Sequence, residues 1–176
     1  MNSLKQLADL IIQRNINEQE ITALIGRPAS IGYIGEYIAS KMFNILLVES
    51  ASQKSIDGHF MDAPFIGRTV NIKWYAKLEW ILDITPEALP EFYLVLAGPR
   101  SEMTTSRGSA RPWLIESVYL FDAHELISVL LAEKVKIGIA TSIKQSLWRS
   151  AEVYPKSNNT QFVLSDEQRR LLGLFG

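Results

Sequence analysis

The chain has 176 residues, about the length of one compact domain. Hydrophobic residues make up 47% and charged residues 21%, which excludes a disordered tail or a collagen-like fibre, and the lack of cysteine excludes disulfides, thiolate zinc sites and thiol nucleophiles. Because 18 Lys and Arg oppose 19 Asp and Glu, the net charge of −1 favours no long-range attraction to a polyanion, and any charged partner must be held by a local arrangement.

Two short helices are predicted at the start of the chain. Apolar residues recur at helical spacing from Ser3 onward, and Asn17 with Glu20 has the spacing of a capping box that opens a second helix. Gly26 ends that helix. We therefore predict a helical hairpin over residues 3–26, packed as part of the domain; a DNA-binding appendage is the alternative.

The rest of the chain alternates between helical and extended patterns. We predict helices over residues 31–43, 122–134, 142–151 and 165–176, the second capped by Asp122, the third by Thr141 or Ser142 and the fourth by a capping box at Ser165. Strands are predicted over residues 45–49, 56–60, 69–75, 92–97, 112–121 and 135–140, and residues 76–91 form a helical or irregular connection. This alternation predicts an α/β fold around a mixed sheet.

The organisation predicted is a single domain over residues 1–176. Within it we expect a helical N-terminal appendage over 1–28, a core over 30–155 and a C-terminal helix over 162–176. The N-terminus does not have the pattern of a signal peptide, and the apolar runs are shorter than the roughly 20 residues of a membrane span. A cytoplasmic protein without a membrane partner is expected.

The densest group of reactive side chains lies between Glu36 and Lys73. Asp57 lies beside a turn, and Asn71 and Lys73 share one face of the predicted strand over residues 69–75 because side chains alternate along a strand. Carboxylate and amide oxygens suit Mg²⁺, and a nearby ammonium group can orient water or stabilise phosphate charge. Glu36, on the polar side of the preceding helix, is a candidate further ligand.

This arrangement resembles the PD-(D/E)XK nuclease superfamily, whose members have the restriction-endonuclease-like fold. The resemblance covers roughly residues 30–100: Glu36 matches the helix acid, Asp57 the hairpin acid, and Asn71-Ile72-Lys73 the (Asp/Glu)-X-Lys motif. It implies a mixed β-sheet flanked by helices, a Mg²⁺ or Mn²⁺ cofactor bound by Asp57, Asn71 and Glu36, and a catalytic role for Lys73. It also implies DNA as substrate and a homodimer as the active assembly.

Asn71 departs from the family pattern, which normally has Asp or Glu there. The site thereby loses one negative charge toward a divalent cation. Three outcomes stay open: Glu36 makes up the deficit; a displaced acid does so, the candidates being Asp62, Glu79 and Asp83; or the site is weak or inactive. A fourth interpretation is structural: Asp57 caps a turn while Asn71 and Lys73 face solvent.

Five basic residues are candidates for contact with nucleic acid. Arginines between small hydroxyl residues suit phosphate binding in the loop over residues 100–111, and further positive charge lies near the motif. The candidates are Arg68, Lys77, Arg100, Arg107 and Arg111. A solvated loop without such a role is the alternative.

Three functions therefore remain open from the sequence. The leading one is a metal-dependent DNA endonuclease that hydrolyses phosphodiester bonds. The second is a catalytically inactive module of the same fold that binds nucleic acid or a protein. The third, an α/β domain that binds a small molecule, would be favoured if Asp57 and Lys73 lay far apart.

Overall fold

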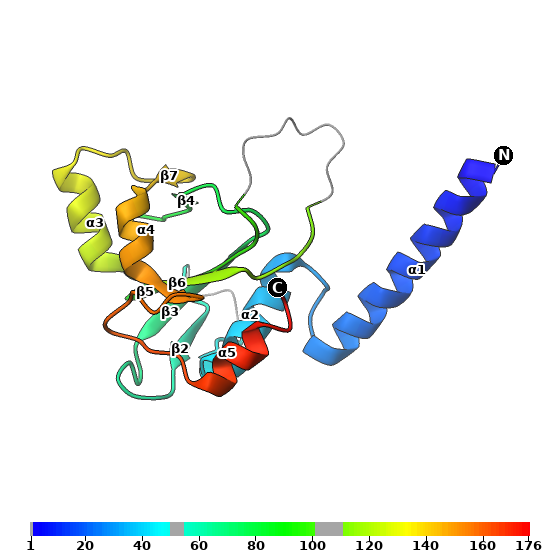
Figure 1. Cartoon of the computed structure of the whole chain (residues 1–176), viewed down its shortest axis with the longest axis horizontal. Helices are drawn as coiled ribbons and strands as arrows, with labels where there is room; N and C mark the ends of the chain where they lie inside the picture. Colours follow the sequence, from blue (N-terminus) through cyan, green and yellow to red (C-terminus); the bar gives the residue numbers. More distant parts are fainter. Residues whose placement is uncertain (1, 50–54, 101–110) are drawn as a thin grey trace.

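A computed structural model describes residues 2–49, 55–100 and 111–176 and has a mixed α/β architecture (Figure 1). The helices are α1 (Asn2–Ile25), α2 (Ile31–Met42), α3 (Ala123–Ala132), α4 (Gln145–Ala151) and α5 (Asp166–Leu172). The strands are β1 (Ile45–Leu47), β2 (Gly58–Phe60), β3 (Thr69–Tyr75), β4 (Ile81–Leu82), β5 (Phe92–Ala97), β6 (Ser117–Asp122), β7 (Thr141–Ser142) and β8 (Glu152–Tyr154). The predicted α/β class with a mixed sheet is confirmed.

The predicted N-terminal hairpin is wrong, because residues 2–25 form the single helix α1. The sequence between the two predicted helices contains no glycine or proline to break the helix. Side-chain bonds also span the expected turn: Gln13 donates to Asn17 at 2.9 Å, and Arg14 donates to Glu18 at 2.8 Å. The helix ends as predicted at Gly26, which has a φ of 71°. Figure 1 shows α1 pointing away from the rest of the molecule.

A six-stranded sheet forms the centre of the fold, with the strand order β1-β2-β3-β5-β6-β8. The first three strands form an antiparallel meander, β3 and β5 are parallel, and the remaining neighbours are antiparallel. The predicted bounds of β3 and β5 are confirmed, and β5 is buried along its whole length. Glu91 links the starts of the two parallel strands, since its carboxylate accepts from the Thr69 N–H at 2.9 Å.

Helices cover both faces of this sheet. On one face, α2 and α5 pack over Val70, Ile72 and Trp74 of β3. On the other, α3 and α4 pack over Tyr93 and Val95 of β5. The C-terminal helix is tied to α2, since Gln168 Nε2 donates to the Met42 carbonyl at 2.7 Å. The capping box at Ser165 that opens α5 is confirmed.

Three predictions for residues 112–151 are corrected. Strand β6 begins at Ser117, later than expected, although Asp122 caps α3 as predicted. Residues 135–140 form no strand; Ile139 is 90% exposed, and the short β7 that follows pairs with β4 in a separate two-stranded sheet. Helix α4 begins after Lys144, without a side-chain cap, because Thr141 and Ser142 belong to β7.

The helices of the described residues do not have the combination of length and hydropathy of a membrane span. The 24-residue α1 is long enough, but its mixed polar sequence is not apolar enough. Within the part of the chain that the structure describes, no helix can cross a bilayer.

Candidate metal and phosphate site

The β1–β2–β3 meander brings Asp57 to the middle of β3. Asp57 directly precedes β2, and its backbone N–H donates to the Val70 carbonyl at 2.9 Å. Gly58 lets β2 lie close to β1, because a Cβ at that position would lie 2.5 Å from Cγ2 of Ile45 and 2.7 Å from the Leu46 carbonyl oxygen. The absence of a side chain at Gly58 therefore allows the close pairing of the β1–β2 hairpin, in which Asp57 directly precedes β2.

The Asp57 carboxylate accepts the hydrogen bond that a backbone carbonyl of a neighbouring strand would otherwise accept from β3. Its Oδ2 accepts a hydrogen bond from the Ile72 N–H at 2.6 Å. Burial raises the pKa of Asp57 above its usual range, against the lowering effects of the Ile72 N–H, Lys73 and Arg27. The carboxylate is thus partly desolvated, just before β2 begins beside β3.

Glu36 comes to the same place from α2. Gly35 lets this helix approach β3 closely, since a Cβ there would lie 3.0 Å from the Cβ of Trp74. Burial and then the charge of Asp57 raise the pKa of Glu36, while Arg27 and Lys73 lower it. The effect of Asp57 on Glu36, and the effects of Arg27 and Lys73 on both, place the two carboxylates in one electrostatic environment.

Arg27, in the linker between α1 and α2, holds the Glu36 carboxylate. Its guanidinium lies 2.9 Å from Glu36 Oε2 and also donates to the Val48 carbonyl at 3.2 Å. The Glu36 side chain is only 17% exposed, so this ion pair is better shielded from solvent than a surface pair. Sequence analysis missed Arg27; the signal was a cation in the short linker just before the helix that carries the acid.

Lys73 and Asn71 project from the opposite face of β3 to Ile72, as alternation predicts. The charge of Lys73 acts on both Glu36 and Asp57, so these three predicted residues are brought together. Asn71 is 4% exposed and pairs in register with Tyr93 of β5. Its Oδ1 has no hydrogen-bond partner among the described residues, which is unusual for a buried amide oxygen.

Carboxylate and amide oxygens are suitable ligands for a divalent cation, but only two acidic residues of the described ranges lie at this site. Glu36 and Asp57 supply carboxylate oxygens, whereas the buried Asn71 oxygen, a hard donor in type, lies on the face of β3 opposite to the one that α2 covers. Among the described residues, no three His, Cys, Asp or Glu side chains are grouped closely enough to hold a metal. Any cation at this site would therefore be held by two acids, with water completing its coordination.

The three candidate displaced acids are engaged elsewhere. Asp62 accepts from Asn44 at 2.9 Å, and Glu79 pairs with Lys77 at 3.2 Å. Asp83 accepts from the Ala140 N–H at 2.7 Å. None of the three contributes to the shifted pKa of Glu36 or Asp57.

The basic residues predicted to contact nucleic acid have different surroundings. Arg68 pairs with Glu91 at 3.1 Å, and Lys77 with Glu79, so both are partly neutralised. The guanidinium of Arg100 lies 5.2 Å from the centre of the Trp80 ring. Arg111 is exposed, and Arg107 lies outside the described residues. The structure thus gives less free positive charge near the site than the sequence suggested.

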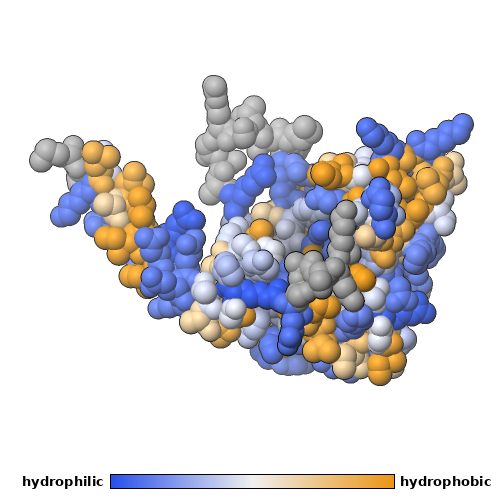
Figure 2. All heavy atoms as spheres, turned by 180° about the vertical axis from the view of Figure 1, so that it is seen from behind, coloured by the Kyte–Doolittle hydropathy of each residue, from blue (hydrophilic) through white to orange (hydrophobic). Residues whose placement is uncertain are grey.

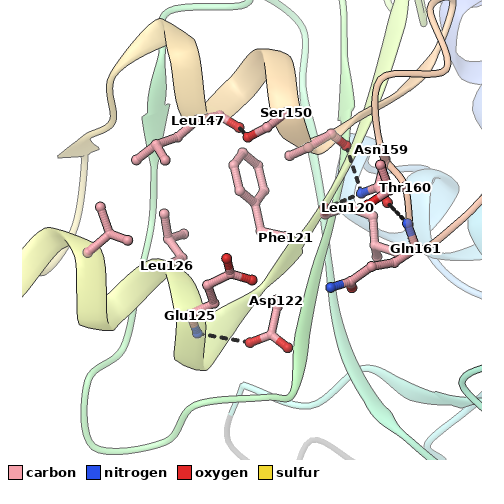
Figure 3. A pocket seen from close by; sticks show the side chains of 12 residues that line it. Leu120, Phe121, Asp122, Glu125, Leu126, Leu147, Ser150, Asn159, Thr160 and Gln161 are labelled. Atoms are coloured by element: carbon pink, nitrogen blue, oxygen red, sulfur yellow. Dashed lines mark hydrogen bonds between the residues drawn. The ribbon is translucent and has the colours of Figure 1, made fainter.

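A separate pocket lies between β6, α3, α4 and the loop that follows β8 (Figure 3). Its volume is about 190 Å³, below the roughly 300–1,000 Å³ of typical small-molecule sites. Its polar groups already serve the fold: Asp122 accepts from the Glu125 N–H at 2.9 Å, and Asn159 donates to the Leu120 carbonyl at 3.0 Å. None of the predicted site residues lines it.

Comparison with known proteins adds no assignment. No protein-family model matches the chain, and no curated protein matches it in sequence. The resemblance to the PD-(D/E)XK nucleases therefore rests on the residues and their arrangement alone.

Proposed function

We propose that this protein is a metal-dependent DNA endonuclease of the restriction-endonuclease-like type. The observation that carries the proposal is the convergence of Glu36 and Asp57 with Lys73 beside the start of β2. Two desolvated carboxylates with raised pKa values favour binding a cation that offsets their repulsion. The order of the elements also supports it, because an acid-bearing helix precedes an acid-bearing hairpin and a strand that carries the lysine.

Each residue has a distinct role in this proposal. Glu36 and Asp57 would hold Mg²⁺ or Mn²⁺, with water completing the coordination. When bound, the cation supplies Lewis-acid activation of the phosphodiester. Lys73 orients the attacking water and stabilises negative charge that develops on the phosphate. Arg100 and Arg111 contact the DNA backbone, and their small number predicts weak non-specific binding with a shallow salt dependence.

Plasmid cleavage in Mg²⁺ or Mn²⁺ tests this function. We expect the wild type to nick or linearise supercoiled DNA, and Asp57→Ala and Lys73→Ala to be slower by about 10²-fold or more. Asp62→Asn is a matched control, since Asp62 lies in the next loop and bonds to Asn44 outside the site. Cleavage that is unchanged in both site variants would overturn the assignment.

A second function is favoured by one specific observation, the neutral Asn71 at the position of the family acid. With only two acids near the lysine, the domain can be a non-catalytic module that binds nucleic acid or a protein. Such a module would bind DNA without Mn²⁺ and without cleaving it. The appearance of Mn²⁺-dependent cleavage in Asn71→Asp, but not in the wild type, would establish this second function.

A further inference from the structure

The first half of α1 carries an apolar face that its own chain leaves uncovered. Leu4, Leu7 and Ile11 recur at helical spacing along one side, flanked by Leu10 and Ile12. All five are exposed, by 72%, 52%, 49%, 60% and 57% in that order. We call these five residues the α1 stripe. Figure 2 shows apolar side chains along this helix, which projects from the body of the molecule.

The α1 stripe has more neighbouring exposed apolar side chains than a helix surrounded by water normally carries. Single exposed aliphatic side chains are common on protein surfaces, whereas five neighbouring ones on one helix mark an interaction site. Isolated helices are marginally stable in water, and in proteins most helical stability comes from packing of an apolar face. The main contact of α1 within its own chain is with α2, and the five residues of the stripe stay exposed, so a partner is needed to cover them.

The charges of α1 indicate which partner fits. Lys5 and Asp9 lie opposite the stripe, and their charges offset each other. The whole helix has two basic and three acidic residues. Helices that bind membrane surfaces or nucleic acid are rich in Lys and Arg, so α1 fits neither. An uncharged apolar face is complementary to a copy of itself, and a two-fold pair places the same face on both partners.

We propose that the α1 stripe is a homodimer interface in which α1 packs against α1 of a second copy. The 24-residue helix is about 36 Å long, and it extends beyond the body, so two copies can meet along α1 without contact between the domains. One helix pair lies at the small end of specific interfaces, which predicts a reversible dimer with a Kd in the micromolar range. This proposal does not depend on the nuclease function.

Sedimentation of the full chain over a range of concentrations tests the interface. We expect a wild-type monomer–dimer equilibrium that Ile11→Lys weakens at least tenfold. Leu24→Lys is the matched control, because Leu24 is also an exposed aliphatic residue of α1, at 70%, but lies away from the stripe. A wild type that stays monomeric at high micromolar concentration, or a dimer that Ile11→Lys leaves unchanged, would overturn the proposal.

Cysteine cross-linking gives an independent readout, because the chain has no cysteine of its own. Ala8 lies within the stripe and Gln13 on the opposite side of the helix. Under mild oxidation, Ala8→Cys should form a disulfide-linked dimer and Gln13→Cys should not. Equal cross-linking of both variants, or binding of a monomeric wild type to phospholipid vesicles, would show that the stripe has another partner. Circular dichroism confirms that each variant keeps its helix content.

Discussion

The Asp57 carboxylate accepts a 2.6 Å hydrogen bond from the backbone N–H of Ile72. The side chain thereby takes the place of a neighbouring strand just before β2 begins. Asp57 therefore has two separable properties, an acceptor oxygen that completes β3 and a negative charge available to a cation. Variants that remove one property or both can distinguish them.

Asp57→Asn and Asp57→Ala are expected to differ in stability. The asparagine keeps an acceptor for the Ile72 N–H and removes a desolvated charge, so it should be at least as stable as the wild type at pH 7. The alanine leaves that N–H unpaired, which costs about 1–3 kcal/mol. Urea unfolding measures both values. Equal destabilisation by the two variants would show that the hydrogen bond is not what stabilises this part of β3.

The two carboxylates should make the stability of the protein fall as the pH rises above about 4, where carboxyl groups ionise in the unfolded chain. The pKa values of Glu36 and Asp57 are raised on folding, mainly by burial. The folded state therefore holds its protons to a higher pH, and stability is lost until both groups have ionised. Thermal unfolding between pH 4 and pH 7 should show a smaller decline in Glu36→Gln/Asp57→Asn. An identical pH profile would contradict this assignment.

A divalent cation should reverse that loss at neutral pH. A ligand at one hundred times its Kd stabilises the folded state by about 2.7 kcal/mol, and each kcal/mol raises the Tm by about 2–4 °C in a domain of this size. We expect Mn²⁺ to raise the Tm of the wild type but not of Asp57→Asn. The Asp62→Asn control should respond like the wild type. This measurement detects binding even where no DNA is cleaved.

Removing Arg27 should strengthen cation binding. The guanidinium occupies Oε2 of Glu36 and repels a cation placed nearby. Arg27→Gln should raise the pKa of Glu36 further in the absence of metal and increase the affinity for Mn²⁺ several-fold, as measured by calorimetric titration. A weaker affinity would instead show that Arg27 holds Glu36 in its binding orientation.

Gly58→Ala should be strongly destabilising. The added methyl group would lie 2.5 Å from Cγ2 of Ile45 and 2.7 Å from the Leu46 carbonyl oxygen, and such overpacking costs about 1–3 kcal/mol or more. Gly138→Ala is the control, because a Cβ there meets nothing within 4 Å. Chemical unfolding of the two variants should therefore give clearly different free energies. Similar values would show that the β1–β2 hairpin relaxes around the new side chain.

The central strands and the face of β3 that carries Lys73 were predictable because local patterns encode them. The alternation along Thr69–Tyr75 placed Lys73 on one face, and the apolar run Phe92–Ala97 indicated a strand buried on both sides. The single α1 was missed because Asn17 and Glu20 mimic a capping box inside a continuous helix. A local pattern is therefore a reliable sign of a helix start only where it does not lie inside a longer helix.

Other features depend on contacts between distant residues and are invisible to pattern analysis. Glu91 neutralises Arg68 only because β3 and β5 pair in parallel register. The two-residue strands β4 and β7 are defined by their mutual pairing, not by their composition. For the same reason, the sequence could place Asn71 on the same strand face as Lys73 but could not show that its amide oxygen is buried without a partner.

The contact between Gln168 and Met42 also sets the order in which parts of the protein can fold during synthesis. These residues are separated by 126 positions, and Leu172 completes the core that α2 shares with β3. On the ribosome, α2 and the hairpin with Asp57 emerge long before α5 can cover them. The nascent chain thus exposes an unfinished apolar face until α5 has emerged. The core that α2 shares with β3 is completed only after α5 has left the ribosome.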